Sequence, residues 1–380
     1  MKYFIIAGEQ SGDLHGSNLV RGLQRKDNSA EISCWGGDLM EEAGAKLLMH
    51  YKKTAFMGFV AVVKNLGAIR KNLELCKKQI LEFNPDVVIF IDYPGFNLRM
   101  AEFAKRSGFR TFYYISPKFW AWNEGRVEKV KKYIDRMFII FPFETNFYRV
   151  HGIETQYLGN PLVDEISRQS ALYSDKTSLS TSLGLENKPV IALLAGSRRH
   201  EIEHVLPVMM KAVTRFPEYQ FVIAGVKNID DSVYTSITAG YDVKLLRNRT
   251  YELLYIAEAA LVTSGTATLE AALHGTPQVV CYKADFLSML IGWMVIKVKH
   301  ISLVNLIMNA EVVKELVQYD LNEKNVIDEL TAILPCGSRR EKMLSGYAEL
   351  RNILGPAGAS DRIASEMVKD LISEHKPAAV

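Results

Sequence analysis

The sequence has few cysteines, no long apolar run and little net charge. Its four cysteines are scattered, without a Cys-x-x-Cys pair, which favours reduced thiols over disulfides or a zinc site. A net charge of +3 is too small to indicate nucleic-acid binding, and no nucleic-acid-binding motif occurs. The apolar start at residues 3–7 is too short for a signal peptide and runs into Glu9. These absences predict a cytoplasmic protein with no nucleic-acid partner.

What the sequence contains is an alternation of apolar strands and amphipathic helices along 380 residues. In the first half, strands are expected at 2–7, 31–35, 86–91, 110–115, 136–141 and 155–158, with helices at 14–25, 98–107, 125–134 and 144–150. In the second half, strands are expected at 189–195, 220–224, 243–246, 260–263 and 278–282. The alternation predicts an α/β protein with two doubly wound, Rossmann-like domains on parallel sheets. The polar stretch 167–182 marks their boundary, and from Glu311 onward the pattern is purely helical.

The small residues Ser264, Gly265 and Thr266 stand between a predicted strand and a predicted helix that ends at Gly275. The start of such a helix offers backbone N–H groups and the positive end of the helix dipole to an anion such as a diphosphate. Glu270, about one turn into the helix, could accept hydrogen bonds from a ribose diol. The alternative is an ordinary strand–helix–strand unit in which Glu270 is solvated.

A second turn of this kind follows the continuous apolar run 189–195, which is typical of a parallel strand buried on both faces. Gly196 permits close approach of the backbone, Ser197 can cap the following helix, and Arg198 offers a fork that matches phosphate oxygens. Two such turns in one α/β domain favour a nucleotide diphosphate bound at the carboxyl ends of the strands.

Asp92 follows the predicted strand 86–91 and is a candidate general base. A carboxylate at the tip of a buried parallel strand lies at the edge where such sheets bind ligands, and apolar neighbours raise its pKa toward neutrality. The alternative is that Asp92 caps the helix expected to begin near Asn97. Because Asn97 is itself a competent cap, we favour the catalytic role. The loop after the first strand lacks the spacing of a dinucleotide or P-loop motif, so it does not indicate a cofactor.

The segment 113–126 is unusually aromatic for a loop. Trp120 and Arg126 could line a pocket for a sugar and its phosphate, although core packing explains aromatic residues more often. Two apolar runs, 55–63 and 286–296, adjoin lysines and fall short of the ~20 residues of a spanning helix. Each is either an interfacial segment or acyl-chain groove, or a buried helix.

His200 and His204 form the His-Glu-x-x-His pattern of zinc peptidases on one face of a predicted helix. The pattern is short, begins directly after the Gly-Ser-Arg turn, and has no third ligand in a recognisable context. An Asp-x-Asp pair, which would hold a metal-bound nucleotide sugar, is also missing. We therefore expect neither a metal nor a cofactor.

Six short motifs occur in order along the chain. They are Gly8-Glu-Gln-Ser-Gly-Asp13, Ile91-Asp-Tyr-Pro-Gly-Phe-Asn97, Ser116-Pro-Lys-Phe-Trp-Ala-Trp122, Gly196-Ser-Arg198, Ser264-Gly-Thr266 with Glu270, and Ser302-Leu-Val-Asn305. The series resembles the lipid-A-disaccharide synthases, inverting glycosyltransferases of the GT-B type, over nearly the whole chain. The resemblance implies two domains that face a cleft. They are an acceptor-side domain, 1–166, joined by the helical tail 355–380, and a UDP-sugar domain, 167–354.

The resemblance also implies a reaction in lipid A biosynthesis. A diacylglucosamine would move from UDP to the 6-hydroxyl of a diacylglucosamine 1-phosphate, giving a β-1,6 disaccharide and UDP without a metal. The protein would be cytoplasmic and peripheral at the inner membrane of a Gram-negative bacterium. The resemblance leaves the oligomeric state open, a homodimer included.

Residue roles follow from the same resemblance. The catalytic candidates are Asp92, as the base, and Arg198, beside the leaving diphosphate. The donor-binding candidates are Gly196, Ser197, Arg198, Ser264, Gly265, Thr266 and Glu270. The acceptor- or lipid-binding candidates are Glu9, Ser11, Asp13, Trp120, Arg126, Asn305, Met57 and Phe59.

One position departs from the family pattern. Members often carry a second aspartate where Gly95 stands here, which leaves Asp92 as the base candidate. Three alternatives stay open at this point: a non-hydrolysing UDP-sugar epimerase on the same fold, a zinc hydrolase acting through His200 and His204, and a non-catalytic UDP-sugar-binding module.

Overall fold

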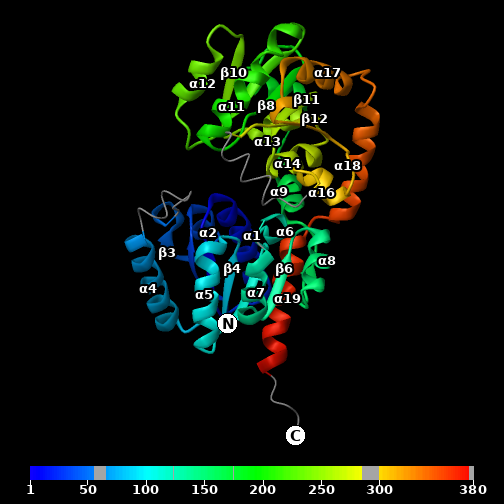
Figure 1. Ribbon diagram of the computed structural model, residues 1–380. Helices are drawn as coiled ribbons and strands as arrows, with labels where there is room; N and C mark the ends of the chain where they lie inside the picture. Colours follow the sequence, from blue (N-terminus) through cyan, green and yellow to red (C-terminus); the bar gives the residue numbers. More distant parts are fainter. Residues whose placement is uncertain (55–65, 123, 174, 285–298, 376–380) are drawn as a thin grey trace. The chain divides into compact units, whose positions relative to one another are not determined.

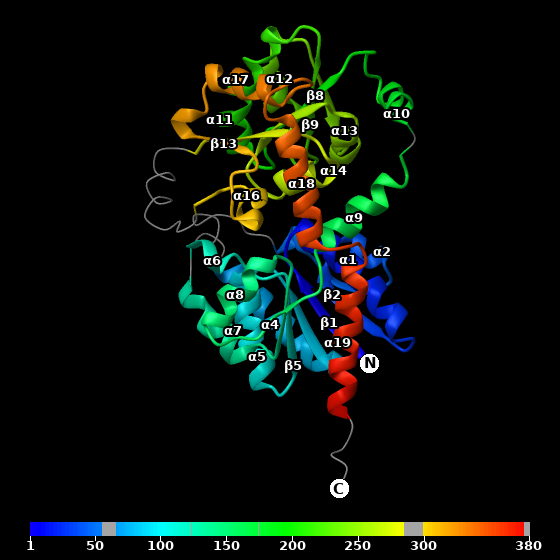
Figure 2. The same cartoon turned by 90° about the vertical axis from the view of Figure 1, so that its right-hand side faces the viewer.

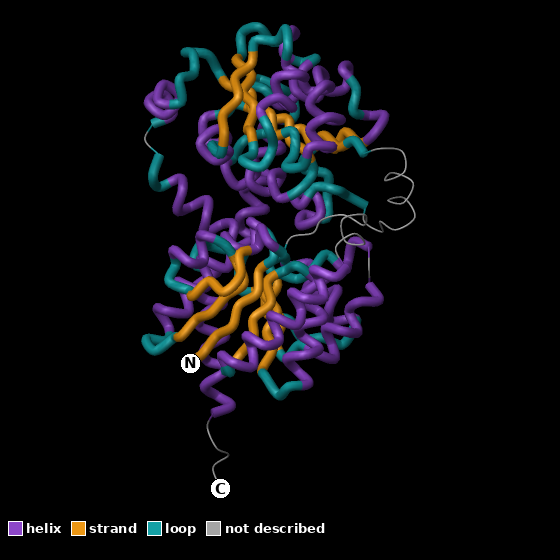
Figure 3. The backbone as a smooth tube through the Cα atoms, turned by 90° about the vertical axis from the view of Figure 1, so that its left-hand side faces the viewer, coloured by secondary structure: helices purple, strands orange, loops and turns teal. Residues whose placement is uncertain are grey.

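The computed structural model describes residues 1–54, 66–122, 124–173, 175–284 and 299–375 (Figure 1). The chain divides into two compact units, Met1–Asp164 with Pro356–Val380, and Glu165–Gly355. Each unit is built on a parallel sheet flanked by helices (Figure 3). The predicted α/β class with two doubly wound sheets is therefore confirmed.

The first unit has a seven-stranded sheet in the order β3-β2-β1-β4-β5-β6-β7, with parallel neighbours throughout. Its strands are β1 (Lys2–Ala7), β2 (Glu31–Gly36), β3 (Lys46–His50), β4 (Val87–Ile91), β5 (Arg110–Tyr114), β6 (Arg136–Ile139) and β7 (Gln156–Tyr157). The order reverses between β1 and β4, whose last residues Ala7 and Ile91 pair. The loops after these two strands leave the same edge, where open α/β sheets bind ligands.

Helices cover this sheet and explain why its strands are apolar. They are α1 (Gln10–Lys26), α2 (Asp38–Glu42), α4 (Leu66–Phe83), α5 (Pro94–Arg106), α6 (Phe119–Trp122), α7 (Val127–Tyr133), α8 (Pro142–Val150) and α19 (Ala359–His375), while α9 (Pro161–Ser170) spans the boundary between the units. All five residues of β4 are 0% exposed. Burying a large apolar side chain to this extent contributes roughly 1.5–3 kcal/mol to folding.

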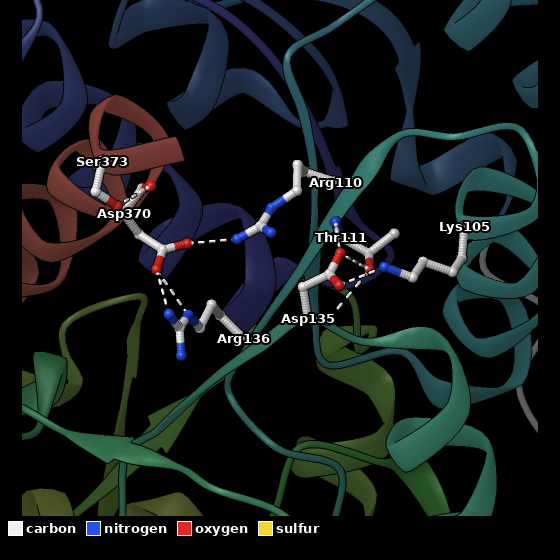
Figure 4. Close-up of polar contacts among 7 residues, drawn as sticks. All are labelled: Lys105, Arg110, Thr111, Asp135, Arg136, Asp370 and Ser373. Carbon is white, nitrogen blue, oxygen red and sulfur yellow. Dashed lines mark hydrogen bonds and ion pairs between the residues drawn. The ribbon is translucent and has the colours of Figure 1, made fainter. Parts of the chain in front are cut away.

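The C-terminal helix α19 is fastened to the first unit by polar contacts near both of its ends. Backbone N–H groups of residues 358–360 donate to the Asp164 carboxylate at 2.6–3.0 Å. Near the other end, Asp370 accepts from Arg110 and Arg136, which begin β5 and β6, at 2.7 Å each (Figure 4). Between these contacts α19 packs along α1 (Figure 2). The last helix of the chain is therefore part of the first unit.

The second unit has a six-stranded sheet in the order β10-β9-β8-β11-β12-β13, again with parallel neighbours. Its strands are β8 (Val190–Leu194), β9 (Gln220–Gly225), β10 (Val243–Arg247), β11 (Ala259–Thr263), β12 (Gln278–Tyr282) and β13 (Lys314–Val317). Its helices are α10 (Lys176–Ser182), α11 (Arg199–Met210), α12 (Asp231–Thr238), α13 (Thr250–Ile256), α14 (Thr266–His274), α16 (Leu303–Met308), α17 (Glu323–Ile333) and α18 (Arg340–Leu354). The order reverses between β8 and β11, so the turns after these strands lie at the ligand-binding edge.

Two edge strands differ from the sequence-based expectation. Strand β13 interrupts the region after Glu311 that we expected to be purely helical, so that prediction was wrong, and β3 was not predicted. Both strands have five residues or fewer and are mostly half-buried, so neither contains a long apolar run. Strand β13 forms because it pairs with β12, and the local sequence pattern does not reveal such a partner.

Candidate functional site

The site of the first unit begins where β4 ends, at Asp92. Asp92 and Tyr93 have φ angles of 43° and 50°, in the left-handed region that costs a non-glycine residue about 1–2 kcal/mol. The Asp92 N–H donates to the Tyr114 carbonyl at 3.2 Å. The Asp92 carbonyl accepts from the Tyr113 hydroxyl at 2.5 Å and from the Asn97 amide at 2.8 Å. Strained backbone that its neighbours hold in place is typical of functional sites.

Tyr93 packs directly on the loop after β1. A side chain at Gly8 would place its Cβ 2.3 Å from the Tyr93 ring, so this position requires glycine. The ring also stacks on Phe96, with centroids 5.6 Å apart, and its hydroxyl donates to the Thr54 carbonyl at 3.0 Å. These contacts hold the loops after β1 and β4 together beside Asp92.

The charges around Asp92 tune its ionisation. Its pKa is raised to about 6, chiefly by burial and then by the Glu9 carboxylate, while the Lys118 ammonium opposes the rise. The residue is nevertheless partly exposed. A carboxylate with a pKa near neutrality can accept a proton from a hydroxyl and release it again. The structure brings together Asp92 and Glu9, both predicted, with Lys118, which sequence reasoning missed because its loop follows a different strand.

Asn97 is not a helix cap, which corrects the argument by which we favoured a catalytic Asp92. The N-cap residue of α5 is Tyr93, whose side chain makes no capping hydrogen bond. The buried Asn97 amide instead donates to the Ile6 and Ile91 carbonyls at 3.4 and 3.2 Å, as well as to that of Asp92. Asn97 therefore ties the ends of β1 and β4 together. Asp92 is not the N-cap residue of α5 either, so the capping alternative fails on the geometry.

Asp13 is buried and bonded within the protein. Its carboxylate accepts from the backbone N–H groups of Gly37, Leu39 and Met40 at 2.8, 3.2 and 3.1 Å. Asp13 thus caps the first turn of α2 and fixes this helix to α1. Ser11, by contrast, is exposed in the first turn of α1.

Trp120 lies in the core of the first unit and is 9% exposed, with its indole N–H donating to Glu144 at 3.1 Å. Glu144, 1% exposed, also accepts from the Phe141 N–H at 3.1 Å, and burial raises the pKa of its carboxyl to about 7. Sequence reasoning missed Glu144, although an acidic residue in the first turn of a helix is a recognisable capping signal. Arg126, which precedes α7, is partly exposed.

In the second unit, the turn after β11 has room for an anion. Helix α14 begins at Thr266 and ends before Gly275, whose φ of 78° is the left-handed glycine stop that the sequence predicts. Its N-cap residue is Gly265, and a Cβ placed there would meet nothing within 4 Å. The Ser264 hydroxyl donates to the Ile301 carbonyl at 2.8 Å. The first N–H groups of α14 therefore border open space, as anion binding at a helix start requires.

Glu270 follows in the same helix with a shifted ionisation. Burial raises the pKa of its carboxyl to about 7, and a hydrogen bond from the Tyr251 hydroxyl opposes the rise. The Tyr251 ring also lies 5.5 Å from that of His274. The Tyr251 hydroxyl thus holds the Glu270 carboxyl in place.

The turn after β8 already holds an anion that belongs to the chain, the Glu201 carboxylate. It accepts from the backbone N–H groups of Ser197 and Arg198 at 3.0 and 3.2 Å and from the Arg198 guanidinium at 3.2 Å. Gly196 has a φ of 117°, and a Cβ there would lie 2.7 Å from Glu201. We had expected Ser197 to cap α11, but the N-cap residue of this helix is Arg198. The Arg198 side chain is 58% exposed and keeps further N–H donors for a phosphate.

Asn305 is fully buried, and its amide is used within the second unit. Its Nδ2 donates to the Val313 carbonyl at 2.8 Å and to Glu315 at 2.9 Å. Glu315 also accepts from the Ile301 N–H at 3.0 Å, and the Ile301 carbonyl in turn accepts from Ser264. The predicted residues Ser264 and Asn305 therefore belong to one network, through Glu315, which sequence reasoning missed.

The remaining predicted residues are the two histidines of the zinc alternative and the residues expected to contact lipid. The His204 ring is turned to its own helix, with Nδ1 2.7 Å from the His200 carbonyl. Among the residues that the structure describes, no group of three or more His, Cys, Asp or Glu side chains could hold a metal ion. Met57, Phe59 and both apolar runs lie outside the described residues. Within the described ranges, no helix is long and apolar enough to cross a membrane.

Comparison with known proteins adds a sequence family to this geometry. Residues 3–356 match the family model of lipid-A-disaccharide synthetase. The chain is 39% identical over 367 residues to the lipid-A-disaccharide synthase of Syntrophus aciditrophicus, covering 95% of both chains. It is 35% identical to that of Geobacter sulfurreducens, covering 97% of both.

Solved structures show the same fold in more distant proteins. The UDP-GlcNAc 2-epimerase from Neisseria meningitidis bound to UDP-GlcNAc is 15% identical with a TM-score of 0.71, covering 97% of this chain and 100% of that one. The calicheamicin glycosyltransferase CalG4 is 13% identical with a TM-score of 0.60, covering 99% of each chain. At such low identities the likeness shows a shared fold and not a shared reaction.

Proposed function

Because the chain belongs to the family of lipid-A-disaccharide synthases and is therefore a glycosyltransferase of lipid A biosynthesis, we propose that it joins two acylated glucosamines. A 2,3-diacylglucosamine passes from UDP to the 6-hydroxyl of a 2,3-diacylglucosamine 1-phosphate. The products are a β-1,6-linked disaccharide 1-phosphate and UDP. The epimerase alternative has only a shared fold in its support.

Asp92 is the general base in this proposal, and its placement carries the proposal. Its carboxylate takes the proton of the acceptor hydroxyl as that oxygen attacks the anomeric carbon from the face opposite UDP. The bond between the anomeric carbon and the diphosphate oxygen breaks, and UDP leaves with the electron pair. Support comes from the position of Asp92 beside the reversal of strand order, from its partial exposure and from its pKa of about 6.

The second unit is the donor side of the proposal. The Arg198 guanidinium and the backbone N–H groups of residues 264–266 stabilise the negative charge that develops on the leaving diphosphate. These groups supply the positive charge for which other glycosyltransferases use a metal. Glu270 accepts hydrogen bonds from the ribose. In the turn after β8, the backbone N–H groups already donate to the Glu201 carboxylate. That turn therefore offers the diphosphate the Arg198 guanidinium instead.

The first unit is the acceptor side. Glu9, Ser11 and Arg126 are exposed or partly exposed there and are proposed to contact the acceptor. Three other predicted residues are buried and form hydrogen bonds within their own units, and they are Asp13, Trp120 and Asn305. Their role in the proposal is to hold the loops of those units in place.

The acyl chains of both substrates connect the reaction to a membrane. We propose that the protein works at the cytoplasmic surface of the inner membrane of a Gram-negative bacterium. The lysine-flanked apolar run with Met57 and Phe59 is the proposed lipid contact, since basic residues around an apolar face suit an anionic bilayer surface. A homodimer stays a prediction.

One incubation separates the candidate functions. The protein is given UDP-diacylglucosamine, with and without diacylglucosamine 1-phosphate, and the products are followed by mass spectrometry. A glycosyltransferase releases UDP and forms the disaccharide when both substrates are present. An epimerase converts the donor without acceptor, and a binding module turns over neither substrate, so either of these results would contradict the proposal.

A further inference from the structure

Lys118 is the single exposed side chain in an otherwise buried stretch. Of residues 111–120, the other nine are buried. No ion pair of Lys118 occurs within the described part of the chain. Exposed lysines are common on helices and edges, but here a buried loop presents one cation to solvent.

The loop that carries Lys118 is anchored on both sides of it. The Ser116 hydroxyl bonds to the Tyr148 hydroxyl, and the Trp120 indole N–H donates to the buried Glu144 carboxyl at 3.1 Å. The backbone is thus fixed two residues before and two residues after Lys118. A cation on a fixed backbone loses less conformational entropy when it binds a ligand than one on a mobile loop.

The loop also lies next to the proposed base. Tyr114 at the end of β5 pairs with Ile91 at the end of β4, and the Asp92 N–H donates to the Tyr114 carbonyl at 3.2 Å. The loops after β4 and β5 therefore leave the sheet side by side. The charges of Glu9 and Lys118 both act on the Asp92 carboxyl, so one cation stands beside two carboxylates.

We propose that Lys118 binds the phosphate of the acceptor while Asp92 takes the proton from the acceptor hydroxyl. This inference rests on the proposed function, which supplies a phosphorylated acceptor and the role of Asp92. A phosphate monoester carries about −1.5 to −2 charges near neutral pH, and Glu9 and Asp92 would repel it. A lysine ammonium is a compact charge with three N–H donors, which offsets that repulsion and positions the phosphate.

The test uses two acceptors, diacylglucosamine with and without the 1-phosphate, at saturating UDP-diacylglucosamine. Lys118→Ala should lower kcat/KM for the phosphorylated acceptor about tenfold to a hundredfold, because a charge-assisted hydrogen bond is lost. The rate with the phosphate-free acceptor should change little. Lys118→Arg should keep most of the preference for phosphate. Lys129→Ala, which removes an exposed lysine of α7 in the same unit, is the matched control and should behave as the wild type does.

Equal losses with both acceptors would overturn the proposal, because Lys118 would then not recognise the phosphate. The pH profile gives a second readout. Without the ammonium, the Asp92 carboxyl is left with the Glu9 carboxylate, the Tyr93 backbone hydrogen bond and the nearby Tyr113 hydroxyl, so its pKa should rise and the acidic limb of kcat/KM should move to higher pH. In Lys118→Ala, the acidic limb of kcat/KM could shift while the preference for the phosphorylated acceptor stays intact. That result would show that Lys118 acts only on the pKa of Asp92, and it would also overturn the proposal.

Failure of the proposed function would look different. It would appear as a wild-type protein that forms no disaccharide from either acceptor, or as an Asp92→Asn variant with full activity. In contrast, an inactive Asp92→Asn variant together with an unchanged preference in Lys118→Ala would refute the role of Lys118 and leave the proposed reaction in place.

Discussion

Asp92 and Asp13 show how the surroundings of a carboxylate decide what it does. Asp92 follows β4, and Asp13 lies in the helix that follows β1, the neighbouring strand. Both were predicted to be site residues. The Asp13 carboxylate accepts from three backbone N–H groups, so its oxygens are occupied. The Asp92 carboxyl has the Tyr93 backbone as its hydrogen-bond partner and a pKa of about 6, and the residue as a whole is partly exposed. We therefore propose Asp92 as the residue that exchanges a proton with a substrate, whereas Asp13 caps α2 and holds it to α1.

Replacing Asp92 with Asn should lower kcat about a hundredfold or more, since a positioned general base contributes typically 10²–10⁴-fold. In the wild type, kcat/KM should reach a plateau about one pH unit above the Asp92 pKa of about 6 and fall as the pH drops through that pKa, because the protonated carboxyl cannot accept a proton. The variant should lack this limb. Asp38→Asn, which removes an exposed carboxylate of the same unit, is the control. An Asp92→Asn rate within about tenfold of wild type would contradict the assignment.

Single-residue roles were predictable where the signal is local. Asp92 stands directly at the end of an apolar strand, so its position at the sheet edge could be read from the sequence. Glu201 lies three residues after Arg198 and could have been found in the same way, because an acidic residue at the third position of a helix is a capping signal. Glu144 carries the same local signal, since it accepts from the Phe141 N–H at the start of α8. Its bond to Trp120 and the position of Lys118 beside Asp92 join different elements, so these two contacts required the fold.

At the scale of elements, two turns with different backbones supply the proposed donor site. The turn after β11 leads into α14, whose N-cap residue is Gly265 and whose start borders open space. The turn after β8 is filled by the Glu201 carboxylate. The diphosphate would therefore contact backbone N–H groups at one turn and a guanidinium at the other.

This division predicts which substitutions weaken UDP binding. Arg198→Ala and Glu270→Ala should each raise the Kd of UDP about tenfold to a hundredfold, because each removes a charge-assisted hydrogen bond worth about 1.5–3 kcal/mol. Arg199→Ala is the matched control, since Arg199 pairs with Glu203 and its side chain is 70% exposed. Asp92→Asn should also leave the Kd unchanged. If calorimetry finds wild-type affinity in both Arg198→Ala and Glu270→Ala, the donor site lies elsewhere.

Helices and strands were predictable where their own residues show a clear apolar pattern that reflects their burial. Strand β4 is covered on both faces, so its five residues are all apolar and the strand was predicted. Strands β3 and β13 are edge strands with half-buried residues, and pairing rather than composition determines them. The start of α5 was misjudged because the left-handed Asp92 and Tyr93 place its N-cap before the polar residue that resembles one.

Helix α19 offers a stability test on a single element. Asp370 is 10% exposed and accepts from two arginines, so Asp370→Asn should lower the free energy of unfolding by about 1.5–3 kcal/mol. Asp361 on the same helix pairs with Arg25 through side chains that are 44% and 55% exposed, and Asp361→Asn should cost less than about 1 kcal/mol. Urea unfolding of both variants checks the difference. Equal effects would mean that Asp370 does not fasten the helix.

At the scale of the whole molecule, one arrangement occurs twice. Each unit has a parallel sheet whose strand order reverses once, and part of each candidate site follows the strands at that reversal. These parts are Glu9 and Asp92 in the first unit, and 196–198 and 264–266 in the second. The same fold occurs in an epimerase and a glycosyltransferase at 13–15% identity, so the fold alone does not decide the reaction. The family match over residues 3–356 identifies a glycosyltransferase, and the loops then suggest how the work is divided.

The charges in those loops lead to a prediction about metals. A leaving diphosphate needs positive charge, and in the proposed mechanism Arg198 and the start of α14 supply it. EDTA should therefore leave the initial rate of disaccharide formation unchanged, and added Mg²⁺ should not raise it. Arg198→Ala serves as the internal control, because Mg²⁺ should fail to restore its activity. A wild-type rate that falls in EDTA and returns with a divalent cation would show that a metal, and not these groups, carries the charge of the departing UDP.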